Sequence, residues 1–206
     1  LAAGLILLSG WDKKSHFVDG MCGSGTFLVE AAMIGANIPA NINREHFAFQ
    51  DWPDYDEVLW KLIRSSQLKR AQDCYGRVIG YDLNPDTVAS AKLNIANSGL
   101  EDYIEIHCEN FFETKKPEGP THLVFNPPYG VRIQGDIPEM YKSIGDTLKK
   151  NYSGAEAWFL TSHMDGLKHV GLRASRKIEI YQAKLECRFV KYEMYQGSKK
   201  MKYKQV

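Results

Sequence analysis

The chain has 206 residues, 26 Lys or Arg against 25 Asp or Glu, and a hydrophobic share of 44%. This composition is ordinary for one globular domain, and the lack of an apolar run of 18 residues excludes a membrane-spanning helix. The four cysteines have no Cys-x-x-Cys spacing, so we expect neither a zinc site nor a disulfide framework, no other metal, and a cytoplasmic location. They are Cys22, Cys74, Cys108 and Cys187.

The charge is unevenly distributed along the chain. Residues 168–206 hold 11 Lys or Arg and 3 Glu, so this end carries +8 in a protein of net charge +1. A basic end of this kind predicts contact with a polyanion. A solvated tail is the alternative that the composition leaves open.

The first elements form a helix, a strand, a glycine turn and a second helix. Residues 1–11 predict a helix that ends at Gly10 and continues from a longer protein. A buried strand ends at 17–18, Asp19 follows it, and an apolar helix covers 27–33. Between them, Gly20, Gly23 and Gly25 are expected to adopt positive φ, which brings backbone N–H groups and a helix N-terminus close to a small molecule.

The glycine turn distinguishes between three kinds of ligand. No Lys follows its last glycine, which argues against a phosphate loop, and the gaps between the glycines do not fit a dinucleotide fingerprint. An acidic residue followed by Gly23-Ser24-Gly25 matches the loop that binds S-adenosylmethionine in methyltransferases. An ordinary glycine turn without a ligand is the structural alternative.

Residues 35–76 form an insertion rich in aromatic side chains. We expect these aromatics to pack as a cap on the core, with stacking on nucleobases as the alternative. Residues 54–74 have helical spacing, with one apolar face and one charged, solvated face. The aromatics are Phe47, Phe49, Trp52, Tyr55 and Trp60, and the apolar face holds Val58, Leu59, Leu62, Ile63 and Leu68.

The second and third predicted strands also end in polar residues. The second, over 78–82, closes on Asp82, and a helix follows from Asn84-Pro85 to the glycine at 99. Asp82 stands where a carboxylate accepts hydrogen bonds from both hydroxyls of a ribose, and a helix cap is the alternative. The third strand, over 103–108, leads to Asn110 and Phe111, an amide and a ring that could contact an adenine.

The fourth predicted strand, over 121–125, ends in Asn126-Pro127-Pro128-Tyr129. The prolines lack N–H groups, so nearby carbonyls stay free as acceptors. The Asn126 side-chain oxygen and the Pro127 carbonyl can therefore accept both hydrogens of a planar exocyclic amine, and Tyr129 offers a ring for stacking. A plain proline turn is the alternative. Beyond it we expect a helix from about 135–138 to 150, a strand over 155–161, a short helix or turn over 164–172, and a hairpin of 177–181 with 185–195.

With both motifs in view, the chain resembles the class I, Rossmann-like methyltransferases of the N-P-P-Y type. Within these it is similar to the family often paired with a THUMP RNA-binding domain, which includes the bacterial 23S rRNA guanine-N2 methyltransferase and tRNA guanine-N2 methyltransferases, and the rRNA branch matches best. The matching pieces are residues 1–11, 19–32, 47–52, 80–82, 126–130 and 185–188.

The resemblance implies an α/β fold with a mostly parallel seven-stranded sheet, helices on both faces and a C-terminal antiparallel hairpin. It implies a single methyltransferase domain over 1–206 with an insertion at about 35–76, and an N-terminal RNA-binding part that lies outside this chain. The implied cofactor is S-adenosylmethionine. Asn110 departs from the family pattern, which usually has Asp there, and Gly20 stands where relatives often have Pro.

The resemblance also implies the reaction and its residues: methyl transfer to the exocyclic N2 of a guanine in RNA, with 23S rRNA as the expected substrate. Adenine-N6 methylation of DNA or RNA, methylation of a protein glutamine, and a non-catalytic RNA-binding module are the alternatives. The implied catalytic residues are Asn126, Pro127, Pro128 and Tyr129. The implied cofactor-binding residues are Asp19, Met21, Cys22, Gly23, Ser24, Gly25, Thr26, Asp82, Leu83, Asn110, Phe111 and Asn126.

Overall fold

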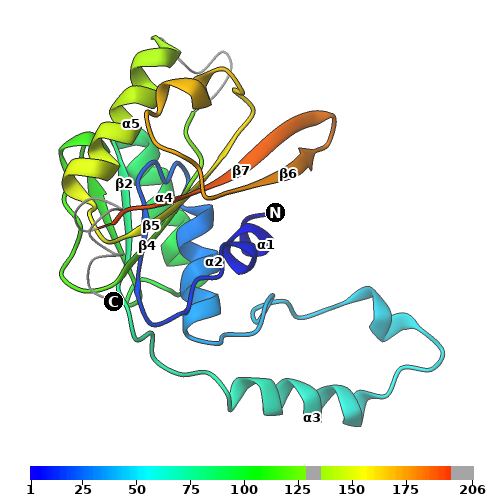
Figure 1. The fold of residues 1–206 in the computed structure, drawn as a ribbon. Coiled ribbons are helices and arrows are strands. Elements are labelled where there is room, and N and C mark those ends of the chain that lie inside the picture. Colours follow the sequence, from blue (N-terminus) through cyan, green and yellow to red (C-terminus); the bar gives the residue numbers. More distant parts are fainter. Residues whose placement is uncertain (129–135, 196–206) are drawn as a thin grey trace, which may run out of the picture.

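A single mixed sheet organises the protein, and the computed structural model describes residues 1–128 and 136–195. The strand order in this part is β3-β2-β1-β4-β5-β7-β6 (Figure 1). The first five strands are parallel, and β7 runs antiparallel to both β5 and β6. The predicted mostly parallel sheet with a C-terminal hairpin is confirmed. The strands are β1 His16–Asp19, β2 Val78–Asp82, β3 Ile104–Cys108, β4 Thr121–Phe125, β5 Glu156–Thr161, β6 Arg176–Gln182 and β7 Leu185–Glu193.

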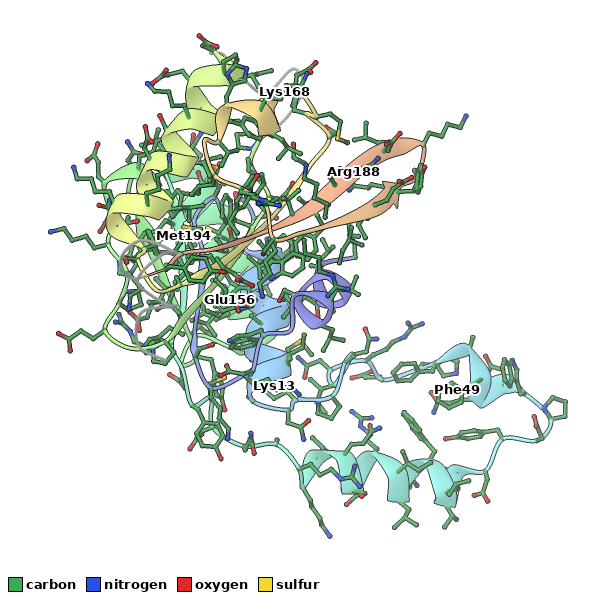
Figure 2. The ribbon with its side chains drawn as sticks, viewed as in Figure 1. Lys13, Phe49, Glu156, Lys168, Arg188 and Met194 are labelled. Atoms are coloured by element: carbon green, nitrogen blue, oxygen red, sulfur yellow. The ribbon has the colours of Figure 1, made fainter. Side chains whose placement is uncertain are left out.

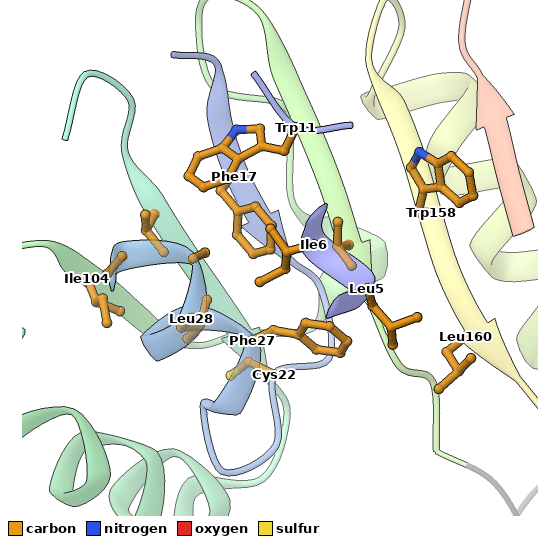
Figure 3. Packing of buried hydrophobic residues seen from close by; sticks show 14 of the residues in the cluster. Leu5, Ile6, Trp11, Phe17, Cys22, Phe27, Leu28, Ile104, Trp158 and Leu160 are labelled. Carbon is orange, nitrogen blue, oxygen red and sulfur yellow. The ribbon is translucent and has the colours of Figure 1, made fainter. Parts of the chain in front are cut away.

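Helices cover both faces of the sheet, and each face has its own apolar core. Phe17 of β1 points into the core under α1, α2 and α4, whereas its neighbour Val18 points into the core under α5. This alternation is the period of two that a strand imposes on its side chains. Figure 3 shows the first core, with Leu28 of α2 among its labelled residues. The helices are α1 Ala2–Ser9, α2 Thr26–Gly35, α3 Glu57–Leu68, α4 Pro85–Ser98 and α5 Ile137–Asn151, with short 3-10 turns η1 Ala48–Asp51, η2 Phe111–Glu113 and η4 Gly166–His169.

The helix ends follow the expected chemistry. Gly10 ends α1 with a φ of 75°, and Gly99 ends α4 with a φ of 67°. Asn84 caps the start of α4, because its side chain accepts hydrogen bonds from the N–H groups of Asp86 and Thr87. No helix within residues 1–128 and 136–195 is long and apolar enough to cross a membrane.

Residues 37–75, which we call the arm, project from the body of the molecule (Figure 1). Its helix α3 is shorter than the predicted 54–74, because the side chain of Asp56 caps its start by accepting from the N–H of Leu59 at 2.9 Å. The aromatics pack, as expected, but on one another within the arm and not as a cap on the core: Trp60 lies 5.4 Å from Phe47 and 5.0 Å from Phe49, ring centroid to ring centroid. Figure 2 shows Phe49 within the arm.

The predicted apolar face of α3 is the part that needs correction. Val58 is 78% exposed and Leu62 is 65% exposed, and the helix has no fully buried residue. The residues that face the rest of the arm are Trp60 and Arg64. Helical spacing identifies residues that share a side, but it does not show what covers that side.

Candidate functional site

Three polar side chains meet at the carboxyl edge of the parallel sheet. Asp19 ends β1, Asp82 ends the neighbouring β2, and Asn126 follows β4 on the other side of β1. The strand register pairs Asp19 with Gly80, so Asp82 lies two residues beyond it along the edge. In open α/β sheets, ligands bind outside the carboxyl ends of the strands where the strand order reverses. Strand order reverses here at β1, between β2 and β4.

The glycine loop between β1 and α2 closes over this edge. Gly23 and Gly25 have φ values of 54° and 83°, as expected, which a side chain would disfavour. Gly20 does not have a positive φ, so that part of the expectation was wrong. Its need for glycine is steric, because a Cβ there would lie 2.6 Å from the ring of Phe111. Proline at this position would meet the same ring.

Hydrogen bonds fix the loop to β2. The N–H of Cys22 donates to the carbonyl of Tyr81 at 2.9 Å, and the N–H of Gly23 donates to Oδ2 of Asp82 at 3.0 Å. The N–H of Asn84 donates to the other carboxylate oxygen of Asp82, also at 3.0 Å. Asp82 is therefore part of the loop framework and is still half-exposed. The cap of α4 is Asn84, so capping that helix does not explain the acid.

A second contact to the loop comes from α4, and sequence reasoning missed it. Asn94 donates from Nδ2 to the carbonyl of Ser24 at 3.0 Å. A Cβ on Gly25 would lie 3.4 Å from that of Ala91 on the same helix. Nothing in the local pattern around Asn94 distinguishes it from other exposed amides of α4, so only the three-dimensional structure could identify it.

Asp19 is a buried carboxyl group with an unpartnered oxygen. It is 1% exposed, Oδ1 accepts the N–H of Met21 at 3.1 Å, and Oδ2 has no hydrogen-bond partner. Burial, with a smaller contribution from the charge of Asp82, raises its pKa to about 8. Such a group is poised to accept a hydrogen bond from a ligand or to neutralise a cation. Burial also raises the pKa of the Cys22 thiol, which keeps it protonated and unsuited to nucleophilic attack.

The remaining predicted cofactor residues differ in exposure. Leu83, next to Asp82, is 71% exposed, which is unusual for a leucine and leaves an apolar surface beside the carboxylate. Asn110 accepts the N–H of Phe112 at 3.1 Å and donates to Glu113 at 3.1 Å, so it caps η2. Phe111 is 3% exposed and its ring packs against Gly20. The predicted contacts of Asn110 and Phe111 with an adenine stay predictions. Ser24 on the loop and Thr26 at the start of α2 are exposed.

Asn126 carries the second unpartnered oxygen at this edge. Its Oδ1 is buried and has no hydrogen-bond partner, Pro127 is buried, and Pro128 is exposed. Buried polar atoms are usually paired, so an orphaned acceptor at a sheet edge indicates a place for a donor. The predicted Tyr129 lies outside the described residues.

We also searched the described residues for a metal site and for hollows away from this edge. Within residues 1–128 and 136–195, no group of three His, Cys, Asp or Glu side chains is arranged to hold a metal ion. A hollow of about 370 Å³ lies at the root of the arm, at the opposite edge of the sheet. It is lined by Asn37, Ile38, Pro39, Ala40, Gln67 and Arg70.

Known proteins similar in sequence point to one class. The profile of the RMKL-like methyltransferase domain matches residues 1–191. The chain is 32% identical to ribosomal RNA large subunit methyltransferase K/L of Shewanella frigidimarina, over 96% of this chain and 29% of that protein. It is also 32% identical to the putative RNA methyltransferase slr0064 of Synechocystis, over 95% of this chain and 52% of that protein. The chain thus spans between about a third and a half of these relatives.

Two solved structures of similar proteins have the same fold as this chain. SMU.472, a putative methyltransferase crystallised with SAH, is 33% identical and superposes with a TM-score of 0.88 over 96% of this chain and 52% of that one. A predicted N6-adenine-specific DNA methylase from Listeria monocytogenes is 28% identical, with a TM-score of 0.82 over 96% of this chain and 50% of that one.

Proposed function

Because the chain belongs to the family of RMKL-like methyltransferase domains, we propose that it transfers a methyl group from S-adenosylmethionine to a planar exocyclic amine, with its carboxyl edge as the active site. The observation that carries this proposal is the convergence of Asp19, Asp82 and Asn126 at one edge, with two buried oxygens that lack partners.

The residues at this edge fit the cofactor. Oδ2 of Asp19 is a buried acceptor without a donor, next to a loop whose Gly23 and Gly25 allow the backbone to approach a ligand. We propose that Asp19 and the loop 21–26 hold the methionine end, and that Asp82 with Leu83 holds the ribose and the adjoining base. The cofactor supplies a methyl group on a sulfonium, which is already a reactive donor, so the protein contributes mainly position and charge placement.

The chain's own contribution to transfer is to orient the amine. Asn126 Oδ1 is a buried acceptor at the end of β4, and the Pro127 carbonyl follows in a segment that lacks competing N–H donors. Two acceptors in one plane hold both amine hydrogens, which directs the nitrogen lone pair toward the methyl donor. A base in a helix is unable to reach such a site without leaving its stack.

We propose that the substrate is RNA, that the amine is N2 of a guanine, and that 23S rRNA is the natural target, in the cytoplasm. The support is the name of the Shewanella relative, a ribosomal RNA large subunit methyltransferase, together with the basic C-terminal end. An RNA-binding domain of THUMP type in the rest of the protein would complete the RNA contact. Adenine N6 in DNA is the second candidate, because the Listeria neighbour is described as a predicted enzyme of that kind.

One experiment separates these substrates. The protein is incubated with methyl-labelled S-adenosylmethionine and, in parallel, with unmodified rRNA, DNA and a protein extract, and the labelled products are digested and identified. We expect labelled N2-methylguanosine from rRNA alone. Labelled N6-methyladenine from DNA would contradict the guanine assignment. Cofactor binding without label in any substrate would favour a binding module over an enzyme.

A further inference from the structure

The arm is rooted at the edge of the sheet opposite to the proposed active site. Its two ends meet there, because the N–H of Gln72 donates to the carbonyl of Ala36, just after α2, at 2.9 Å. Gly76 also packs against the carbonyl of Ser15, just before β1. Asp19 lies at the other end of β1. Figure 1 shows that the arm projects away from the body of the molecule, so we do not expect it to cover the target base.

The inner side of α3 is covered by other residues of the arm. Trp60 packs edge-on against Phe47 and Phe49, whose rings stack on each other. Arg64 donates from Nη2 to the carbonyl of Ile42 at 2.7 Å. Trp60 and Arg64 are also the two residues of α3 that are partly buried, while the other ten are exposed. The arm therefore holds its own shape, and its inner side has no need of a further partner.

The outer side of α3 is apolar and uncovered. Val58, Leu59 and Leu62 are 78%, 51% and 65% exposed. At about 3.6 residues per turn, Val58 and Leu62 lie on the side opposite to Trp60, and Ser65 and Ser66 extend this side by one turn without adding charge. A contiguous apolar surface on a projecting helix is typical of an interaction site.

The charges of the arm identify the partner. It carries five basic and six acidic residues, which disfavours a nucleic acid. The acids Asp54, Asp56 and Glu57 lie just before or at the start of α3, and the bases Lys69 and Arg70 directly follow its end. If a second α3 is turned end for end, each acidic end meets a basic end while the uncharged sides face each other.

We propose that α3 pairs antiparallel with α3 of a second copy of this chain, across a two-fold axis close to Val58 and Leu62. A helix of 12 residues is about 18 Å long, so this contact is small. Small interfaces between proteins are weak and form reversibly. The association therefore depends on protein concentration. The resulting dimer contains two active sites, which stay separate from each other.

Sedimentation equilibrium tests the pairing. The mass of the wild-type chain is expected to rise with concentration from 23.4 kDa toward twice that value. The double variant Val58→Glu, Leu62→Glu should stay at the monomer mass, because it places acidic groups on both sides of the contact. Mixing it with the variant Val58→Lys, Leu62→Lys should restore association, since opposite charges then face each other. That rescue requires two copies of the same surface.

The matched control is Leu93→Glu, which places the same charge on a leucine of α4 that is 62% exposed, and this variant should associate like the wild type. Circular dichroism should show the same helix content for all variants, because the replaced side chains are exposed. A wild-type chain that stays monomeric would overturn the proposal. So would association of the glutamate variant at wild-type strength, or a mixture of the two charged variants that stays monomeric.

Discussion

Asn94 on α4 donates a hydrogen bond of 3.0 Å to the carbonyl of Ser24, which lies 70 residues earlier in the glycine loop. The same helix touches the loop again where Ala91 lies beneath Gly25. The loop is thus held between two neighbouring elements, with Asp82 bonding to Gly23 from the end of β2. A loop held from both sides keeps one conformation, which lowers the conformational entropy that the loop loses when a ligand binds.

Removing the helix contact should weaken cofactor binding modestly. Asn94→Ala deletes one neutral hydrogen bond, so we expect the dissociation constant for S-adenosylmethionine to rise about two- to tenfold in a calorimetric titration. Asn97→Ala is the matched control, because it makes the same change on an exposed part of the same helix. Equal weakening by both substitutions would show that the contact to Ser24 is not responsible.

Removing the charge of Asp82 should have a larger effect. Asp82→Asn keeps one acceptor for the loop but loses the second carboxylate oxygen and the charge, so we expect cofactor affinity to fall about 10- to 100-fold. Asp86→Asn, four residues further along in the exposed first turn of α4, removes the same charge and should leave affinity near the wild-type value. Undiminished binding by the Asp82 variant would contradict the ribose assignment.

The sheet could be predicted from the sequence because each strand carries its own local signal. The apolar run before Asp19, the run before Asp82 and the run before Asn126 each end in a polar residue at a turn. These signals place the three side chains at one edge once the strands are taken as parallel, and the structure confirms that placement. Local patterns sufficed because the active edge is built from strand ends.

Contacts between distant segments could not be predicted in the same way. Gly20 and Phe111 are far apart in the sequence, and nothing near either residue indicates that a ring lies against the glycine. The same is true of Val58 and Leu62, whose spacing predicts an apolar side but not whether the chain covers it. The unusual pKa of Asp19 depends on complete burial, which is a property of the folded protein.

The packing of Gly20 against Phe111 predicts a cost for any side chain at this position. In Gly20→Ala the new Cβ would lie 2.6 Å from the ring, so we expect the free energy of unfolding to fall by about 1–3 kcal/mol in urea denaturation. Adding Phe111→Leu should recover part of this loss. Gly4→Ala in α1 has no atom within 4 Å and should be neutral or stabilising by up to about 1 kcal/mol. A stable Gly20→Ala variant would contradict the packing.

The raised pKa of Asp19 predicts that the stability of the protein falls as the pH rises. Its pKa is about 8 in the folded chain against an ordinary value of 3.8, so between these values the folded state keeps a proton that the unfolded state has released. The free energy of unfolding should therefore decrease across this range and level off above it. Asp19→Asn, which resembles the protonated acid, should be more stable than the wild type by about 1 kcal/mol or more above pH of about 8.

The same variant should lose affinity for S-adenosylmethionine, because a carboxyl group can release its proton when a cationic ligand binds beside it, whereas the amide of Asn stays neutral. A gain in stability together with a loss of binding is typical of a group kept for function. Asp102→Asn, at an exposed turn, is the control and should change neither property. If Asp19→Asn follows the wild-type dependence of stability on pH, the carboxyl group is not the source of that dependence.

Asn126 should be needed for transfer but not for folding. Its buried Oδ1 has no partner in the protein, so Asn126→Ala should change the free energy of unfolding by less than about 1 kcal/mol and leave cofactor binding intact. Transfer should fall on the order of 100-fold or more, because the amine loses a positioned acceptor.

The variant Asn151→Ala is the control with the opposite expected result. Its side chain donates to the carbonyl of Thr114 at 2.8 Å, so this variant should lose stability while each folded molecule keeps its activity. Equal loss of cofactor binding and transfer in Asn126→Ala would place the residue in the cofactor pocket and not at the target amine.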